Sequence, residues 1–416
     1  MPIPRIAIAG AGPGGLTLAR LFQRNGITCT IFELDVDRNA RSQGGLIDLH
    51  ADMGQRALRE AGLIEEFQKH ILPEADSKKL MKADGTIAWD ENEKDEEKDF
   101  HRQARDCPEI DRAKLRDILL DSVEPDSIQW NSKITRVESN KDNPAQFDVH
   151  FAEGVAEAFD LVVGADGAWS KVRPLVSTQV PEYSGVVMIE MMAFNVSQKK
   201  QWLSDYVGNG SFFMFDEGRC LICQRNGYDG IRVYAGVRQP ESWIEDCGID
   251  WEDPIKARKQ LTEQYFGDVH EDLKRLMSEA SDSLLVRSLH MLPVGFKWSS
   301  RPGVTLLGDA AHLMTPFAGV GVNIALADAM LLAHALSKQK DNFEADLEGS
   351  LKQAIQEYED QMFKVAKINM EKTYQGLINH FSAGGIEHRV KHMQKLQKLQ
   401  ESATRIEAAR KNGTMV

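Results

Sequence analysis

Apolar residues at the start of the chain alternate between strand-like and helix-like spacing. Residues 5–9 form a short apolar run, residues 16–26 carry apolar positions at helical spacing, and residues 28–32 form a second apolar run. A strand, a helix and a strand within about 30 residues are the building block of a parallel sheet. The pattern therefore predicts an α/β fold with a Rossmann-like domain.

Shorter elements continue this domain. The patterns predict a strand at 46–50, a helix at 53–61 that ends at Gly62, a helix at 110–123, β-structure at 128–137 and 147–151, and a strand at 161–163. The dense charge run at 90–99 predicts a solvated loop.

Residues 176–285 follow a different pattern. Short runs of alternating apolar and aromatic residues are separated by turn signals such as Gly208-Asn209-Gly210. Alternation bounded by turns is typical of hairpins. We expect a largely antiparallel sheet here, with one helix near 255–266.

The last part of the chain returns to α/β spacing. A strand is predicted at 304–307 and a helix at 322–336, followed by amphipathic segments at 351–365 and 386–399 with apolar steps of three and four. The polar face of the second segment is basic, which is compatible with a membrane-surface helix or with a bracing helix. We favour the brace.

Together these patterns predict three parts. Residues 1–176 and 287–345 form the Rossmann-like domain, residues 177–286 form an inserted, largely antiparallel β-sheet domain, and residues 346–416 form C-terminal helices that bridge the two.

Charge and composition narrow the class of partner. The 416 residues carry 50 Lys+Arg and 63 Asp+Glu, a net charge of −13, which argues against nucleic acid or an anionic membrane as the main partner. The sequence has no run of about 18 apolar residues, so no membrane-spanning helix is expected. The N-terminal residues lead into a strand rather than a signal-peptide core, so a cytoplasmic protein is expected.

The five cysteines are sparse and odd in number, as suits a reducing compartment. Cys220 and Cys223 match C-x-x-C but lie in a strand-like run, where positions i and i+3 point to opposite faces. We favour two independent cysteines over a redox pair or half of a metal site, and we expect no metal.

Three glycine-rich turns carry the chemistry. The first, residues 10–15, fits G-x-G-x-x-G between a predicted strand and a predicted helix. Gly10 permits the tight turn, Gly12 lets the backbone approach a pyrophosphate and Gly15 allows close helix packing, while Pro13 and Gly14 begin the helix. Glu33 follows about 20 residues on, where an acid binds ribose hydroxyls and disfavours a 2′-phosphate. This turn predicts FAD or NAD rather than NADP.

The second and third turns follow later strands. Residues 164–173 contain Asp166 and Ser170, which could simply cap a turn. Residues 308–323 contain Asp309, which can accept hydrogen bonds from sugar hydroxyls, and then a new helix N-terminus near Gly321 that would favour an anion such as reduced flavin. His312 is expected to be a buried structural residue rather than a catalytic one.

In their order and spacing these three turns resemble those of the single-component flavoprotein hydroxylases with a p-hydroxybenzoate-hydroxylase-like fold. The matching residues are the G-x-G-x-x-G stretch, then Asp166, Gly167, Ser170, Val172 and Arg173, then Gly308 and Asp309. The resemblance covers residue 5 to about residue 335. It implies a Rossmann-like FAD-binding domain and a substrate-binding β-sheet domain.

Within that family the chain looks most like the tetracycline-inactivating monooxygenases and related fungal natural-product monooxygenases. Residues 41–50 and 108–116 carry this likeness. It implies that Arg41 meets NADPH. The residues implied to contact FAD are Gly10, Gly12, Pro13, Gly14, Gly15, Glu33, Asp48, Arg112, Arg116, Asp166, Asp309, Pro316, Gly319, Gly321, Val322 and Asn323.

Several residues depart from the family pattern. Val320 stands where the family often has Gln, while Ser211 and Val233 stand where the tetracycline enzymes have Arg and His. Glu190 replaces a Gln, and with Phe213 and Phe317 it is our candidate for substrate contact. A different substrate is therefore expected, an aromatic or enolic natural product.

The resemblance implies a reaction as well as a fold. FAD would be held without a covalent bond, NAD(P)H would reduce it, and a flavin C4a-hydroperoxide would hydroxylate or epoxidise the substrate with oxygen from O2. No catalytic base is assigned, NADPH and NADH both stay open, and a monomer or weak dimer is expected. The alternatives are a flavin oxidase or dehydrogenase and, less favoured, a non-catalytic flavin-fold binding protein.

Overall fold

The computed structural model describes residues 4–40, 44–92, 107–227, 229–395 and 397–398. The chain divides into two compact units. Unit 1 comprises Met1–Asp76, Glu97–Ser184 and Ser288–Gln375, and unit 2 comprises Ser77–Glu96, Gly185–Arg287 and Gly376–Val416.

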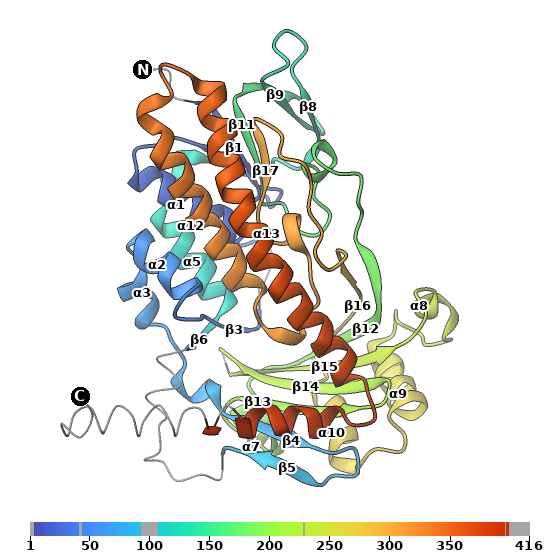
Figure 1. Ribbon diagram of the computed structural model, residues 1–416. Coiled ribbons are helices and arrows are strands. Elements are labelled where there is room, and N and C mark those ends of the chain that lie inside the picture. Colours follow the sequence, from blue (N-terminus) through green and yellow to red (C-terminus); the bar gives the residue numbers. More distant parts are fainter. Residues whose placement is uncertain (1–3, 41–43, 93–106, 228, 396, 399–416) are drawn as a thin grey trace, which may run out of the picture. The chain divides into compact units, whose positions relative to one another are not determined.

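Unit 1 is built on a parallel sheet of five strands in the order β17-β11-β1-β2-β7 (Figure 1). The strands are β1 (Ile6–Ala9), β2 (Thr30–Phe32), β7 (Ile128–Gln129), β11 (Leu161–Gly164) and β17 (Val304–Leu306). Neighbouring strands pair in parallel throughout. β1, β11 and β17 are wholly buried, as the continuous apolar runs predicted. The expected Rossmann-like sheet is confirmed.

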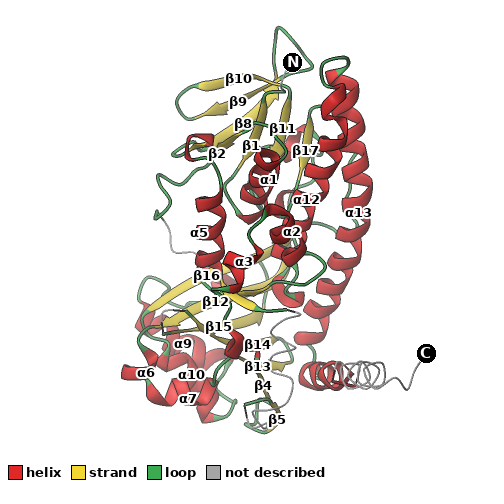
Figure 2. Cartoon of the chain, turned by 90° about the vertical axis from the view of Figure 1, so that its left-hand side faces the viewer, coloured by secondary structure: helices red, strands yellow, loops and turns green. Residues whose placement is uncertain are grey.

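Helices of unit 1 pack against one another beside this sheet (Figure 2). They are α1 (Pro13–Arg24), α2 (Gly54–Ala61), α3 (Ile64–Gln68), α5 (Arg112–Ser122), α11 (Asp309–His312) and α12 (Gly321–Gln339). α1 contacts α2, α5 and α12, and its apolar face is completely buried. α2 ends at Gly62, whose positive φ of 74° closes the helix as predicted.

Two smaller sheets complete unit 1. One holds β8 (Ile134–Ser139), β9 (Phe147–Phe151) and β10 (Val155–Phe159), and the other pairs β3 (Leu46–Asp48) with β6 (Glu109–Asp111). The Phe32 ring on β2 lies 5.0 Å from the Phe151 ring on β9.

Two predicted boundaries in unit 1 are wrong. The helix expected from residue 110 begins at Arg112, because Ile110 pairs with Ile47 in a strand and the Asp111 side chain caps the helix by accepting from the Ala113 amide. The β-structure expected at 128–137 is two strands in different sheets, with Asn131 at a φ of 54° between them.

Unit 2 is built on a seven-stranded sheet in the order β16-β12-β15-β14-β13-β4-β5. The strands are β4 (Lys78–Met81), β5 (Ile87–Asp90), β12 (Glu182–Ala193), β13 (Ser211–Asp216), β14 (Arg219–Asn226), β15 (Gly230–Arg238) and β16 (Ser283–Met291). Its helices are α6 (Val196–Lys199), α7 (Gln201–Val207), α8 (Trp243–Asp246), α9 (Pro254–Tyr265) and α10 (Glu271–Glu279). The predicted, largely antiparallel sheet is confirmed: β12 with β15, β15 with β14, β14 with β13 and β4 with β5 pair antiparallel, and β13 with β4 pairs parallel.

The predicted limits of the sheet domain are incomplete. Residues 77–92 were expected in the Rossmann-like domain, but β4 pairs with β13, so these residues belong to unit 2. Strand β4 forms backbone hydrogen bonds with the edge of β13, which is more than 100 residues away in sequence. No local pattern in residues 77–92 predicts that pairing. Of the charge run at 90–99, residues 93–99 lie outside the described residues.

Cys220 and Cys223 are free, buried, and on opposite faces of β14. Cys220 lies opposite Gly236, whereas Cys223 lies opposite Val233. Burial raises the pKa of both thiols. This geometry agrees with two independent cysteines.

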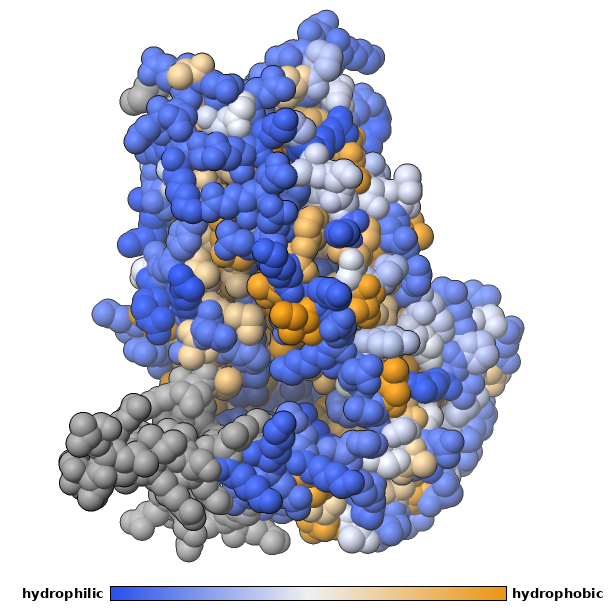
Figure 3. Space-filling view, viewed as in Figure 1, coloured by the Kyte–Doolittle hydropathy of each residue, from blue (hydrophilic) through white to orange (hydrophobic). Residues whose placement is uncertain are grey.

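A long helix, α13 (Leu347–His380), follows α12. Its buried stripe consists of Leu351, Ile355, Tyr358 and Met362, as the spacing predicted. The surface over the unit 1 helices is mostly hydrophilic (Figure 3). Residues 385–395 are also helical. Within the described part of the chain, no helix combines the length and hydropathy needed to cross a membrane. The bridging role of these helices stays a prediction.

A buried carboxylate fastens α13 to unit 1. Glu359 is 1% exposed and accepts hydrogen bonds from Trp298 Nε1 (2.9 Å), Thr305 Oγ1 (2.8 Å) and Ser300 Oγ. Burial raises the pKa of Glu359, although the three donors act in the opposite direction. The carboxylate thus joins α13 to β17 and to the preceding loop.

We expect Glu359→Ala to lower the free energy of unfolding by roughly 3 kcal/mol, because it leaves several buried donors without an acceptor. Urea titration of both proteins would measure the difference. Asp360→Ala is the matched control, since Asp360 is the exposed neighbour on the same helix. Equal losses for the two variants would contradict the role given to Glu359.

Candidate functional site

The three predicted turns leave neighbouring strands at the same edge of the parallel sheet. The first follows β1, the second follows β11 and the third follows β17, and these strands are adjacent in the order β17-β11-β1. Backbone hydrogen bonds connect the exits: Gly10 N to Phe32 O (2.8 Å), Ala165 N to Ala9 O (2.9 Å) and Leu307 N to Gly164 O (2.9 Å). Ligands of open α/β sheets bind at this carboxyl edge.

The glycines of the first turn have different tasks. Gly10 has a φ of 101°, and a Cβ on Gly15 would clash with the Gly10 carbonyl oxygen. A Cβ on Gly14 would lie 2.6 Å from Leu307 Cδ1. By contrast, no described atom lies within 4 Å of a Cβ on Gly12. The turn is therefore packed tightly against the protein except at Gly12, where it is open.

α1 begins in this opening. Gly12 is its N-cap, Pro13 follows, and no side chain caps the helix. The first amides of an uncapped helix are donors with a positive partial charge, which suits a phosphate group.

Glu33 lies next to the first turn, directly after β2. It is buried, and its carboxylate accepts from the Ala11 amide (2.6 Å) and the Asp35 amide (3.0 Å). The side chain therefore holds the turn in shape. The predicted contact with a ribose stays a prediction.

Arg116, on α5, is buried beside Asp35. Their side chains form an ion pair of 3.2 Å and are each 4% exposed, and Arg116 Nη1 donates to the Arg38 carbonyl. Arg116 Nε is buried with no partner among the described residues. Arg112 is exposed at the start of α5, and Arg41 lies outside the described residues.

Arg173 connects the second turn to the third. It is buried and donates to the carbonyl oxygens of Ala310 (2.8 Å), Asp309 (3.1 Å) and Ala168 (2.9 Å). Desolvation lowers the pKa of this guanidinium despite nearby carboxylates. Ser170 Oγ accepts from the Arg173 amide, as the capping interpretation proposed. The D-G-x-x-S-x-V-R string thus holds two turns together.

Asp166 and Asp309 are the carboxylates of these turns. Asp166 Oδ2 accepts from the Lys171 amide (2.6 Å), while Oδ1 is buried without a partner in the described part of the chain. Burial raises the pKa of both acids. Asp309 is nevertheless exposed to solvent.

His312 and Asp328 support the third turn from behind. His312 Nε2 lies 2.6 Å from Asp328 Oδ2, which also accepts from the Gly308 amide (2.9 Å). Burial alone would lower the pKa of His312, but the carboxylates of Asp328 and Asp309 together raise it. The histidine is buried, as predicted, and faces an acid that sequence reasoning missed. A lone acid in the apolar α12 was the available signal.

α12 begins opposite the end of β3. Its N-cap Val320 offers no side-chain cap, and a Cβ on Gly321 would meet no described atom within 4 Å. Asn323 is fully buried, accepts from the His50 amide (2.7 Å) and donates to the Asp48 carbonyl (2.9 Å). A Cβ on Gly319 would lie 3.6 Å from Asp48 Oδ1. Asp48, Gly319 and Gly321 are therefore brought together.

The remaining candidates for the cofactor and the substrate are distributed over both units. Pro316 and Phe317 lie in the short 3-10 helix Pro316–Ala318, and Val322 follows in the first turn of α12, all in unit 1. Glu190 on β12 and Phe213 on β13 lie in unit 2. Glu190 forms an ion pair with Arg232, a residue the sequence interpretation did not select.

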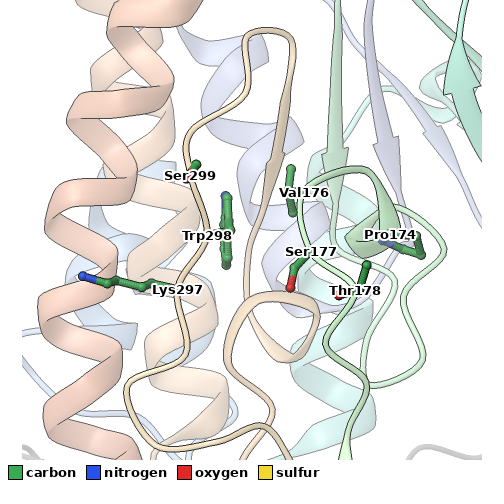
Figure 4. A pocket seen from close by; sticks show the side chains of 7 residues that line it. All are labelled: Pro174, Val176, Ser177, Thr178, Lys297, Trp298 and Ser299. Carbon is green, nitrogen blue, oxygen red and sulfur yellow. The ribbon is translucent and has the colours of Figure 1, made fainter.

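The residues at the carboxyl edge fit FAD. Two uncapped helix starts, the open positions at Gly12 and Gly321, and the unpartnered polar atoms of Asp166 and Arg116 are features that a bound dinucleotide would use. A separate shallow depression of about 610 Å³ lies elsewhere in unit 1, between residues 174–178 and 297–299 (Figure 4). None of the predicted cofactor residues lines it.

Known proteins are similar to this chain in sequence and in fold. Residues 5–341 match the FAD binding domain family. The monooxygenase penA of Penicillium thymicola is 30% identical, over 92% of this chain and 96% of that protein.

Two solved structures share the fold. HpxO of Klebsiella pneumoniae, complexed with FAD and uric acid, has a TM-score of 0.70 and 22% identity, over 96% of this chain and 93% of that one. The tetracycline destructase Tet(51) has a TM-score of 0.67 and 19% identity, over 95% and 97%. The predicted resemblance to flavin monooxygenases is confirmed. The chain belongs to the FAD binding domain family and is one of its FAD-dependent monooxygenases.

Proposed function

We propose that this protein uses NAD(P)H and O2 to insert one oxygen atom into a small aromatic or enolic molecule, by hydroxylation or epoxidation. One oxygen atom of O2 enters the substrate, the other leaves as water, and NAD(P)H with one proton supplies the two electrons. The observation that carries the proposal is the meeting of three glycine-rich turns on adjacent parallel strands, beside two uncapped helix starts. When bound there, FAD would supply the hydride acceptor and the activation of O2.

The chain's own residues would hold and orient the cofactor. The amides at the start of α1 would bind the pyrophosphate, and Gly12 leaves room for its approach. Glu33 and Asp309 would accept hydrogen bonds from hydroxyl groups, with Asp48, Arg112, Arg116 and Asp166 as further contacts.

The start of α12 would face the negative charge of the reduced ring, since its amides are uncapped. Pro316, Gly319, Gly321, Val322 and Asn323 belong to this segment. Asn323 acts through the backbone of residues 48 and 50. Arg41 would meet NADPH, and Glu190, Phe213 and Phe317 would contact the substrate.

The proposal is tested with the purified chain. We expect it to retain FAD, seen as flavin absorbance, and to oxidise NADPH or NADH faster when one compound from a panel of phenols, tetracyclines and indoles is added. Mass spectrometry under ¹⁸O₂ should then find one labelled oxygen in the product. Substrate oxidation with stoichiometric H2O2 and without NAD(P)H would support a flavin oxidase instead. Failure to retain FAD would revive the non-catalytic alternative.

Gly12→Ala should weaken FAD binding at least about tenfold, because the added methyl group occupies the space through which the backbone approaches the pyrophosphate. The fold should stay intact, because no described atom lies within 4 Å of that methyl group. Gly15→Ala should instead lower the free energy of unfolding of the FAD-free protein by roughly 2 kcal/mol, because its methyl group overlaps the Gly10 carbonyl oxygen. Flavin fluorescence titration and urea titration separate the two effects. Strong destabilisation by Gly12→Ala would contradict the open position.

Asp328→Ala should lower the free energy of unfolding by roughly 3 kcal/mol at pH 6, because it leaves the buried His312 and the Gly308 amide without their acceptor. The raised pKa of His312 gives a stabilisation that is complete below the ordinary histidine pKa and is lost as pH rises through the folded-state pKa. The difference between the two proteins should therefore shrink at alkaline pH.

Asp341→Ala, an exposed acid just after α12, is the control for Asp328→Ala. Urea titrations between pH 6 and pH 9 (about the range in which histidine loses its charge) measure the effect. A difference that grows with pH would contradict the assigned pair. FAD affinity should fall as well, because the pair holds the turn that carries Asp309.

A further inference from the structure

One face of the unit 2 sheet carries a mixed set of half-buried side chains. The strand register places Glu190 opposite Tyr234, Tyr234 opposite Ile222, and Ile222 opposite Phe213. Directly opposite residues of antiparallel strands point to the same side. We call this the Glu190 face, which consists of Glu190, Phe213, Ile222, Gln224, Arg232 and Tyr234.

The other face of the sheet is an ordinary core. Ile189, Val233 and Phe212 lie on it and are fully buried, and α7 and α10 contact β14 and β15. The six residues of the Glu190 face are partly buried, whereas their neighbours on the same side of the strands are buried: Met188, Met192, Phe215 and Cys220. The half-buried residues therefore form a patch within a side of the sheet that is otherwise packed.

An ion pair lies within this face. Glu190 and Arg232 belong to adjacent strands at diagonal positions and are paired through Oε1 and Nη1, with side chains 17% and 11% exposed. Arg232 Nε is buried and has no partner among the described residues. Burying such a pair seldom stabilises a fold more than apolar residues would, so a role in recognition is the better explanation.

Aromatic side chains share this face: Tyr234 lies directly opposite Glu190, whereas Phe213 lies three strands away from Glu190, on β13. Phe213 lies on the same face, and the Arg389 guanidinium is 5.7 Å from its ring centre. The next side chain along this side of β13, Phe215, stacks on His380 with ring centres 4.0 Å apart. Tyr234, the aromatic residue next to the pair, favours a planar ring as the ligand.

We propose that the Glu190 face recognises a planar aromatic lactam or ureide, whose ring N–H donates to Glu190 and whose adjacent C=O accepts from Arg232. This inference rests on the proposed function and names its substrate class. The pair offers an acceptor beside a donor, which is the complement of an N–H/C=O edge. A carboxylate would be repelled by Glu190, and a hydrocarbon would cover the ion pair without a polar contact to either charge.

The test measures binding to the FAD-loaded protein by calorimetry, with three probes. Quinolin-2(1H)-one has both the N–H and the C=O, its N-methyl derivative has only the C=O, and benzoate is the anion. We expect the N–H lactam to bind roughly tenfold or more tightly than the other two, as for one hydrogen bond to a charged group.

The variant Glu190→Leu/Arg232→Met should erase this preference, because it removes both members of the pair and leaves no unpaired buried charge. Glu190→Gln, which keeps the shape of the side chain, should weaken lactam binding by several-fold and improve benzoate binding. Glu279→Gln is the matched control and should change neither, since Glu279 pairs with Arg275 on α10. Thermal melts and FAD absorbance confirm that each variant is folded.

Equal binding of the two lactams to the wild-type protein, or tighter binding of benzoate, would overturn the inference. So would a preference for the N–H lactam that survives in the double variant. Binding does not require turnover, so selective lactam binding without oxygen insertion contradicts the proposed function alone. Oxygen insertion into phenols that is unaffected by the double variant contradicts only the lactam inference.

Discussion

Hydrogen bonds between the exits of parallel strands are the constraint on which the site depends. Gly10 donates to the end of β2, Ala165 to the end of β1 and Leu307 to the end of β11. Each of these hydrogen bonds fixes where a turn leaves the sheet relative to the neighbouring strand. Three segments that are more than 100 residues apart in sequence therefore reach the same edge. The helix starts and carboxylates of the cofactor site take their places from this arrangement.

Buried charges then fix the shapes of the turns. Arg173 donates to carbonyl oxygens of the third turn, and Asp328 accepts from both His312 and Gly308. Groups of this kind cost free energy to bury and are tolerated when they are fully hydrogen-bonded. Here they hold the backbone of the third turn, from which the Asp309 side chain is exposed to solvent.

The two units use their sheets differently. In unit 1 the strands β1, β11 and β17 are buried on both faces, and the candidate cofactor residues lie at the ends of the strands. In unit 2 one face is core, and the Glu190 face presents polar and aromatic side chains along the middle of the strands. The first arrangement suits a large cofactor bound by backbone amides, and the second suits a small planar molecule bound by side chains.

The sequence by itself determined the Rossmann-like unit, the three turns and the antiparallel sheet, because these depend on local spacing of apolar residues and glycines that the chain displays directly. Only the tertiary structure decided that residues 77–92 join unit 2, that Ile110 is in a strand, and that Arg173, Asp328 and Arg232 have their present partners. These features depend on contacts between segments distant in sequence. A strand edge or a buried charge can be satisfied by many partners, and packing alone selects which one is used.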